Sequence, residues 1–271
     1  MTEDLLDLAV TAARGAGVLL RERFGAPRTD VDTKSSVTDM VTDADRAAEA
    51  LITEGIHAER PDDAILGEET GEARGSSGLR WVVDPLDGTT NFLFGIPHWA
   101  VSIACEDVGG PFVGVVYDAL RDELFTATRG GGASLNGERI AASGATDLSR
   151  ALVATGFSYR AEERGAAAVL LPTILPRVRD VRRAGAASLD LAYVAAGRVD
   201  AFYESGLAPW DSAAGRLLVM EAGGRIDAMP GLGPSGDGLI ASSPGIFDAL
   251  RDLIDRALGE LPESRRTRAA R

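Results

Sequence analysis

The sequence predicts an α/β protein of the α+β type, with helices and sheets packed as layers in one compact unit. Apolar residues recur at helical spacing over residues 3–24, strand-like runs separated by glycine-rich turns fill the middle of the chain, and strands alternate with helices from about residue 148. No linker, repeat or low-complexity block interrupts residues 3–258. We therefore expect a single domain there, followed by a basic, polar and disordered tail at residues 259–271.

The amino-terminal part is predicted to hold two helices and a short strand. The first helix covers residues 3–24, and a turn-rich stretch follows at 25–36. We expect Asp43 to cap the second helix, because an aspartate side chain accepts hydrogen bonds from the free N–H groups at a helix start. A short strand at 64–69 then ends in two acidic residues.

The rest of the chain is predicted as a β-rich block followed by alternating strands and helices. Pro172 and Pro176 interrupt the helix expected at 166–178, because proline cannot donate a helical hydrogen bond. The expected strands are 99–106, 112–117, 124–128, 151–155, 201–204 and 238–241, and the other expected helices are 188–197, 209–223 and 244–258.

The composition excludes several classes of protein. Acidic residues outnumber basic ones by 41 to 28, and the formal net charge of −13 disfavours binding to nucleic acid or to an anionic membrane. The acidic amino terminus lacks a signal-peptide pattern and no apolar segment is long enough to span a membrane, so we expect a cytoplasmic protein. With only two histidines and one cysteine, zinc sites, disulfides and a catalytic thiol are disfavoured, and we expect Cys105 to be a buried apolar residue.

Residues 81–92 carry the strongest functional pattern in the chain. They read Trp-Val-Val-Asp-Pro-Leu-Asp-Gly-Thr-Thr-Asn-Phe, with Asp84 and Asp87 on either side of a proline. The order predicts a buried strand that ends in a turn and opens a short helix. Carboxylates at such a turn hold hard cations, and N–H groups at a helix start bind phosphate. Metal and phosphate together indicate phosphoester chemistry.

Acids elsewhere lie at strand ends or helix starts, where their side chains can converge on this turn. Glu68 ends a predicted strand, and Asp211 opens a predicted helix. Together with Asp84, Asp87 and the carbonyl of Leu86, they supply enough oxygen ligands for two Mg²⁺ ions. Other roles remain open: Asp211 as a helix N-cap, Glu68 as a solvated strand end, and Asp84 as the partner of an arginine.

Three further residues are candidates for binding phosphate and water. Gly88 lets the backbone approach a phosphate, which the N–H groups of Gly88 and Thr89 would hold. The hydroxyl of Thr89 suits the orientation of a metal-bound water, and it equally suits an ordinary helix start. Lys34 is the only lysine and lies in a polar turn, where it either completes a phosphate or metal-water site or is simply solvated.

These motifs resemble those of the inositol monophosphatase family of Mg²⁺-dependent, lithium-sensitive sugar phosphatases. The resemblance spans about residues 5–258. Residues 84–92 are similar to the family's first signature, and Pro209-Trp-Asp-Ser-Ala-Ala-Gly is similar to the second. Gly67-Glu-Glu lies where the family keeps a metal-binding glutamate. The resemblance implies a layered αβαβα sandwich of the sugar-phosphatase kind, with a catalytic domain over 3–258.

The resemblance also implies which groups bind metal. Glu68, Asp84 and the Leu86 carbonyl would bind a first Mg²⁺ ion. Asp84, Asp87 and Asp211 would bind a second ion. Glu68 would also help to hold a weaker third ion through water.

Roles in catalysis and substrate binding follow from the same resemblance. Asp45 and Thr89 would pair and, with Glu68, orient the attacking water. Glu204 would contact substrate hydroxyls. Ala186 stands where the family often has serine or threonine, so only a backbone contact to substrate could persist there; Arg183 either compensates or is a surface arginine. The implied substrate-binding set is Asp87, Gly88, Thr89, Ala186, Glu204 and Asp211.

We therefore hypothesise an inositol-phosphate phosphatase that converts inositol 1-phosphate to myo-inositol by direct in-line attack of a metal-activated water. The Thr90-Asn-Phe ending of the motif favours this branch. Histidinol-phosphate phosphatase and fructose-1,6-bisphosphatase remain alternatives on the same scaffold. A non-catalytic, metal-dependent binding or regulatory protein is the alternative from a different class. The resemblance implies a homodimer.

Overall fold

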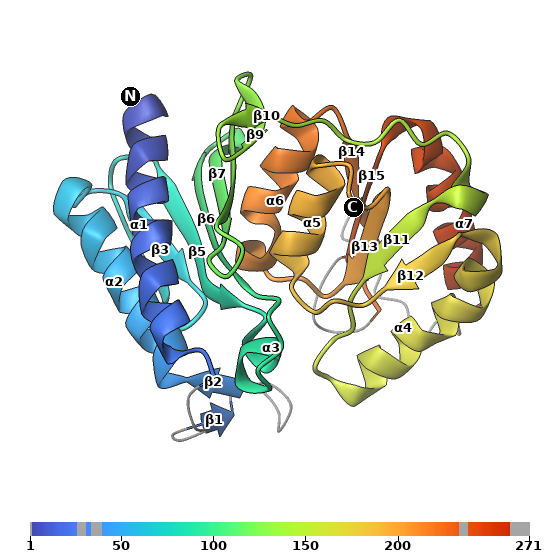
Figure 1. Cartoon of the computed structure of the whole chain (residues 1–271), viewed down its shortest axis with the longest axis horizontal. Helices are drawn as coiled ribbons and strands as arrows, with labels where there is room; N and C mark the ends of the chain where they lie inside the picture. Colours follow the sequence, from blue (N-terminus) through green and yellow to red (C-terminus); the bar gives the residue numbers. More distant parts are fainter. Residues whose placement is uncertain (1, 26–30, 34–39, 233–237, 261–271) are drawn as a thin grey trace.

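Five layers make up the part of the chain that the computed structural model describes, which is residues 2–25, 31–33, 40–232 and 238–260. Helices α1 (Thr2–Arg23) and α2 (Asp43–Glu59) cover the outer face of an eight-stranded sheet. Helices α5 (Ala187–Ala195) and α6 (Pro209–Glu221) lie between that sheet and a five-stranded sheet, and α4 (Ala161–Ile174) and α7 (Phe247–Gly259) cover the far side (Figure 1). The predicted mixed α/β class and its αβαβα layering are confirmed.

The eight-stranded sheet is antiparallel except where β3 and β5 pair in parallel. Because side chains alternate across a strand, β5 serves two layers: Trp81 and Val83 pack toward α1 and α2, whereas Val82 packs toward α5 and α6. Cys105 is buried in the core that contains Trp81 and Val83, as expected. In spatial order the strands are β10 (Glu138–Arg139), β9 (Gly132–Leu135), β8 (Glu123–Thr128), β7 (Gly110–Asp118), β6 (Ala100–Asp107), β5 (Arg80–Asp87), β3 (Ala64–Gly67) and β4 (Gly71–Ala73).

The five-stranded sheet is mixed. Its order is β12 (Asp180–Arg182), β11 (Leu152–Thr155), β13 (Ala201–Ser205), β15 (Gly238–Ser242) and β14 (Arg225–Met229), with parallel pairing at β12–β11 and β11–β13 only. Helix α5 is buried almost all round, which is typical of a helix enclosed between two sheets. The candidate active site forms where loops from both sheets meet over α5 and α6.

Short elements complete the described ranges. They are β1 (Val31–Thr33), β2 (Met40–Thr42), α3 (Thr89–Leu93) and the 3₁₀ turns Leu148–Arg150, Leu175–Arg177 and Pro244–Ile246. No helix in these ranges is long and apolar enough to cross a membrane. Most of the expected tail, residues 261–271, lies outside the described residues.

Several local predictions are wrong for identifiable reasons. Thr42, not Asp43, caps α2, because its hydroxyl accepts hydrogen bonds from the N–H groups of Ala44 and Asp45. The strand expected at 64–69 ends at Gly67 and turns back as β4, and β1 lies in the stretch expected to be turn.

The helix expected at 166–178 is displaced toward the amino terminus. It begins at Ala161, continues through Pro172, which does not interrupt it, and ends before Pro176, which lies in a 3₁₀ turn. Strands β4, β12 and β14 were not predicted. Each lies at a sheet edge and carries exposed polar residues, so its sequence lacks the apolar run of a central strand.

Candidate active site

The turn that joins β5 to α3 has the predicted strand–turn–helix geometry. Residues 81–87 are buried, and Gly88 caps α3 with a φ of 95°, in the left-handed region that favours glycine. A Cβ atom on Gly88 would lie 3.0 Å from the carbonyl oxygen of His98, so the close approach of the backbone at His98 also favours glycine at position 88.

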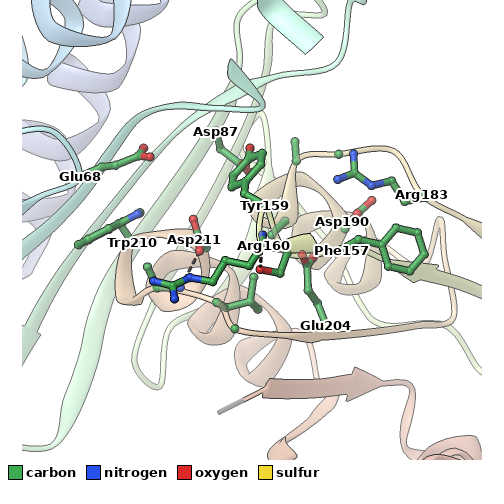
Figure 2. A pocket seen from close by; sticks show the side chains of 18 residues that line it. Glu68, Asp87, Phe157, Tyr159, Arg160, Arg183, Asp190, Glu204, Trp210 and Asp211 are labelled. Atoms are coloured by element: carbon green, nitrogen blue, oxygen red, sulfur yellow. Dashed lines mark hydrogen bonds between the residues drawn. The ribbon is translucent and has the colours of Figure 1, made fainter. Parts of the chain in front are cut away.

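The four acids predicted to bind metal come together across the two sheets. Glu68, Asp87 and Asp211 line a cavity of about 250 Å³, with Glu204 on its wall (Figure 2). Asp84 is buried with 1% of its surface exposed, and its carboxyl group lies close to that of Glu68. Glu68 is half-buried beside this cavity, so it is not a solvated strand end.

Each aspartate has one carboxylate oxygen fixed by a backbone N–H group. Oδ1 of Asp84 accepts from Leu86 N at 3.0 Å, and Oδ2 of Asp211 accepts from Ala208 N at 2.6 Å. Oδ2 of Asp87 accepts from both the N–H and the hydroxyl of Ser188, at 2.7 and 2.5 Å. These bonds set the direction of each carboxylate and leave its other oxygen for a ligand.

The same bonds settle one alternative and reveal an unexpected residue. Asp211 is not the N-cap of α6, which is Ala208, but it supports the helix start as the N3 residue whose side chain accepts from Ala208 N. Ser188 at the start of α5 was not predicted as a site residue. Its only signal in the sequence is a hydroxyl at a helix start, and its partner is 101 residues away.

The three aspartates have raised pKa values in this arrangement. Burial, followed by the charge of Glu68, raises the pKa of Asp84 and of Asp211 well above the usual range. Burial raises the pKa of Asp87 to about 6. No arginine in the described ranges bonds to Asp84, so the arginine alternative has no support.

This donor set fits a hard divalent cation. Carboxylate and carbonyl oxygens are the ligands that Mg²⁺ and Ca²⁺ prefer, and nitrogen or sulfur donors do not join them here. Within the described ranges, no three acidic, histidine or cysteine side chains are already gathered closely enough to hold one ion. Like charges repel without a cation between them, so we expect these carboxylates to draw inward when an ion binds.

Asp45 and Thr89 meet although they are 44 residues apart. The Thr89 hydroxyl lies 3.0 Å from Asp45 Oδ1 and 3.1 Å from the Leu86 carbonyl oxygen, both of which are acceptors. Asp45 Oδ2 accepts from the N–H and hydroxyl of Thr42, so its carboxyl group is fully buried and held on both sides. Burial raises the pKa of Asp45.

Glu49 is a second residue that the sequence did not reveal. It lies on α2 with none of its surface exposed, and its two carboxylate oxygens accept the N–H groups of Glu69 and Thr70 at 2.8 Å each. A Cβ atom on Gly67 would lie 2.5 Å from Glu49 Oε1, so glycine is needed at that point. Glu49 thus fixes the turn that carries Glu68.

Glu49→Gln should therefore weaken metal binding without removing a metal ligand. The amide leaves one of the two N–H groups without an acceptor, and loss of such a support lowers metal affinity about 10- to 100-fold. We expect the Mg²⁺ concentration for half-maximal activity to rise by that factor, with activity recovering at saturating Mg²⁺. Asp63→Asn is the control, because Asp63 accepts bonds from Arg60 and Trp81 at the other end of β3. An equal Mg²⁺ shift in both variants would contradict the role of Glu49.

The remaining predicted residues have different outcomes. Ala186 is buried, and both Ala186 and Glu204 line the cavity. Arg183 also lines the cavity, although it is exposed. Lys34 lies outside the described residues. Glu204 Oε2 would lie 2.0 Å from a Cβ atom on Gly156, so that glycine gives the glutamate its room.

Glu204 should make the stability of the metal-free protein depend on pH. Burial, followed by the charge of Asp190, raises the pKa of Glu204 from 4.5 to about 8. Because the pKa of Glu204 is higher in the folded state, its protonation stabilises the fold. This contribution to the free energy of unfolding is complete below about pH 4.5, declines as the pH rises, and is lost once the pH passes about 8. Thermal midpoints measured in chelator from pH 5 to 9 should fall more steeply for the wild type than for Glu204→Gln. Parallel pH profiles would contradict this assignment.

Comparison with known proteins places the chain among its relatives. The model of the inositol monophosphatase family matches residues 1–256. The chain is 48% identical over 229 residues to the Nus factor SuhB of Escherichia coli K12, covering 84% of this chain and 86% of that protein. It is 45% identical over 258 residues to an inositol-1-monophosphatase of Rhizobium meliloti, covering 94% and 97%.

Solved structures of similar fold are also found. The extragenic suppressor protein suhB of Bartonella henselae matches with a TM-score of 0.87 and 40% identity, covering 93% of this chain and 99% of that one. The IMPase of Thermotoga maritima matches with a TM-score of 0.85 and 34% identity, covering 95% and 99%.

Proposed function

This chain belongs to the inositol monophosphatase family, a family of phosphatases that are generally metal-dependent, and from that premise we propose that it hydrolyses a small polyol phosphate, with inositol 1-phosphate as the first candidate. The observation that carries the proposal is the cavity itself. Glu68, Asp87 and Asp211 line it together, and burial raises the pKa of Asp87, of Asp211 and of the neighbouring Asp84. Such a site favours a cation together with the phosphate that the cation attracts.

We propose Mg²⁺ as the cation, with two sites and a weaker third. Glu68, Asp84 and the Leu86 carbonyl would hold the first ion; Asp84, Asp87 and Asp211 would hold the second; and Glu68 would help to hold the third. When bound, such ions lower the pKa of water and neutralise charge on a phosphoryl group.

The chain's own residues would then position the reactants. The Thr89 hydroxyl, held by Asp45, would orient the attacking water, and Glu68 would accept a hydrogen bond from it. The N–H groups of Gly88 and Thr89 would donate to the phosphate. Glu204, which also lines the cavity, would accept hydrogen bonds from the substrate hydroxyls.

A kinetic panel tests the proposed substrate. Inositol 1-phosphate, histidinol phosphate, fructose 1,6-bisphosphate and 3′-phosphoadenosine 5′-phosphate are compared by kcat/KM at saturating Mg²⁺, with Li⁺ added as an inhibitor. The proposal predicts the highest value for inositol 1-phosphate and inhibition by Li⁺. A higher value for histidinol phosphate or for fructose 1,6-bisphosphate would favour that alternative instead.

A second candidate function comes from the name Nus factor, which several relatives about 48% identical carry. That likeness favours a binding role that does not need turnover, on the same scaffold. The Asp84→Asn variant separates the two, because it should stop hydrolysis while leaving the outer surface unchanged. If host cells that contain only this variant grow as the wild type does, the binding role is favoured.

Two features of the assembly are proposals on the strength of the family. We propose that residues 3–258 form the catalytic domain without help from the tail at 259–271, which truncation and assay would test. We also propose a homodimer, for which light scattering should give twice the chain mass of 28.3 kDa.

A further inference from the structure

Asp190 on α5 differs from the other buried acids of the described chain. Only 3% of its surface is exposed, yet its carboxylate forms no hydrogen bond or ion pair with a described residue. Each of the other buried acidic side chains accepts at least one hydrogen bond from the protein. These are Asp45, Glu49, Asp63, Asp84, Asp87, Asp118 and Glu163.

Asp190 lines the same cavity as Asp87 and Asp211. Figure 2 shows it between Arg183 and Glu204, on the opposite side of the cavity from Glu68. An unpaired buried carboxylate is costly, because it has lost the hydrogen bonds that water gives it. The cavity is the remaining place from which a partner can come.

Glu204 and Arg183 line the same cavity. Glu204 forms no side-chain hydrogen bond with a described residue, and Arg183 forms no ion pair with one although its charge acts on both acids. One cation and two carboxylates together carry a formal charge of −1. The two carboxylates therefore need partners from whatever enters the cavity, and Arg183, which is exposed, can donate to the same occupant.

The chemistry of the three groups selects the occupant. Hydroxyl groups suit them all, because a hydroxyl donates to a carboxylate and accepts from a guanidinium. A second phosphate would be repelled by Asp190 and Glu204. An ammonium group would satisfy the two acids but would lie against Arg183. A neutral polyol is thus the best fit.

We propose that Asp190 is a specificity-determining residue, which with Glu204 accepts hydrogen bonds from two neighbouring hydroxyls of the substrate while Arg183 donates to one of them. The inference rests on the proposed function and adds to it the means by which the distal half of the substrate is recognised. It also explains how the cavity tolerates Ala186, since the hydroxyl contacts come from α5 and β13 instead.

The test compares two substrates in the Asp190→Asn variant. Inositol 1-phosphate has the hydroxyls, whereas p-nitrophenyl phosphate has none. A lost hydrogen bond to a charged group should lower kcat/KM for inositol 1-phosphate about 10- to 100-fold, mainly through KM, with p-nitrophenyl phosphate changed less than about twofold. Equal losses for both substrates would overturn the proposal. A larger loss for histidinol phosphate than for inositol 1-phosphate would show an ammonium site and would also overturn it.

Stability separates this role from a structural one. Because the carboxylate has no protein partner, Asp190→Asn should leave the thermal midpoint of the ligand-free protein unchanged or higher. Asp200→Asn is the matched control in the same half, since Asp200 accepts bonds from Leu152 N at 2.8 Å and from the Ser143 hydroxyl at 2.6 Å. The control should lower the midpoint and leave the substrate ratio unchanged. A midpoint that falls as far in Asp190→Asn as in the control would overturn the proposal.

Failure of the proposed hydrolase function can be told apart from failure of the inference about Asp190. If the wild type released no phosphate from either substrate, the hydrolase assignment would fall, and binding of inositol 1-phosphate by calorimetry would still test Asp190. Weaker binding in Asp190→Asn supports the inference, and equal binding contradicts it. Asp190→Ser provides a second variant should the first not fold.

Discussion

Replacement of Asp84 by asparagine should reduce Mg²⁺-dependent phosphate release by on the order of 1000-fold, the equivalent of about 4 kcal/mol of transition-state stabilisation. Asp84 is the ligand that both proposed metal sites share. Asp84 is 1% exposed, its carboxyl group lies close to that of Glu68, and Leu86 N donates to its Oδ1. The measurement is kcat at saturating Mg²⁺, with the rise in thermal midpoint on Mg²⁺ addition as a second readout.

The Asp84→Asn variant should fold without bound metal. Removal of an uncompensated buried charge costs little and can stabilise, so the midpoint in chelator should equal or exceed that of the wild type. The variant's midpoint should then be insensitive to added Mg²⁺. Near-normal activity in Asp84→Asn would exclude a shared metal ligand at this position.

Thr89→Val should lower kcat by about 100-fold or more while KM and the Mg²⁺ requirement change little, because positioned proton-transfer groups contribute about 10²- to 10⁴-fold. The change removes the hydroxyl that links Asp45 to the Leu86 carbonyl and keeps the shape of the side chain. The loss of an orienting group, rather than of a ligand, should appear in kcat alone.

Two controls accompany this variant. Thr89→Ser keeps the hydroxyl and should retain most of the activity. Thr155→Val removes another buried threonine hydroxyl, which donates to the Tyr203 carbonyl oxygen at 2.8 Å, and should affect stability only. If Thr89→Val changed the Mg²⁺ requirement as strongly as kcat, Thr89 would act on metal binding rather than on the water.

Local features of the site were predictable from the sequence. The apolar run before Asp84 and the glycine after Asp87 define a strand, a turn and a helix within 12 residues, and short-range sterics decide that geometry. The meeting of Glu68, Asp87 and Asp211 was predictable because strand ends and helix starts at one edge of a layered fold lie close together. The pairing of Asp45 with Thr89 came from the resemblance alone.

Other features depend on contacts between distant segments and could not be predicted locally. Glu49 looks like an ordinary helix residue until the turn after β3 packs against it. Ser188 on α5 becomes a site residue only because Asp87 approaches from the end of β5. Asp190 is set apart by the bonds it lacks, which no pattern of neighbours reveals. Edge strands β12 and β14 follow from sheet pairing rather than from an apolar pattern.

The most direct test of the proposed function is the Mg²⁺ dependence of phosphate release from inositol 1-phosphate by the wild-type chain. We expect release that is absent in chelator, rises to saturation as Mg²⁺ is added, and is restored when Mg²⁺ replaces the chelator. Release that continues undiminished in chelator, or no release at saturating Mg²⁺ from any phosphate monoester of the panel, would contradict the proposal that these carboxylates form a metal-dependent phosphatase site.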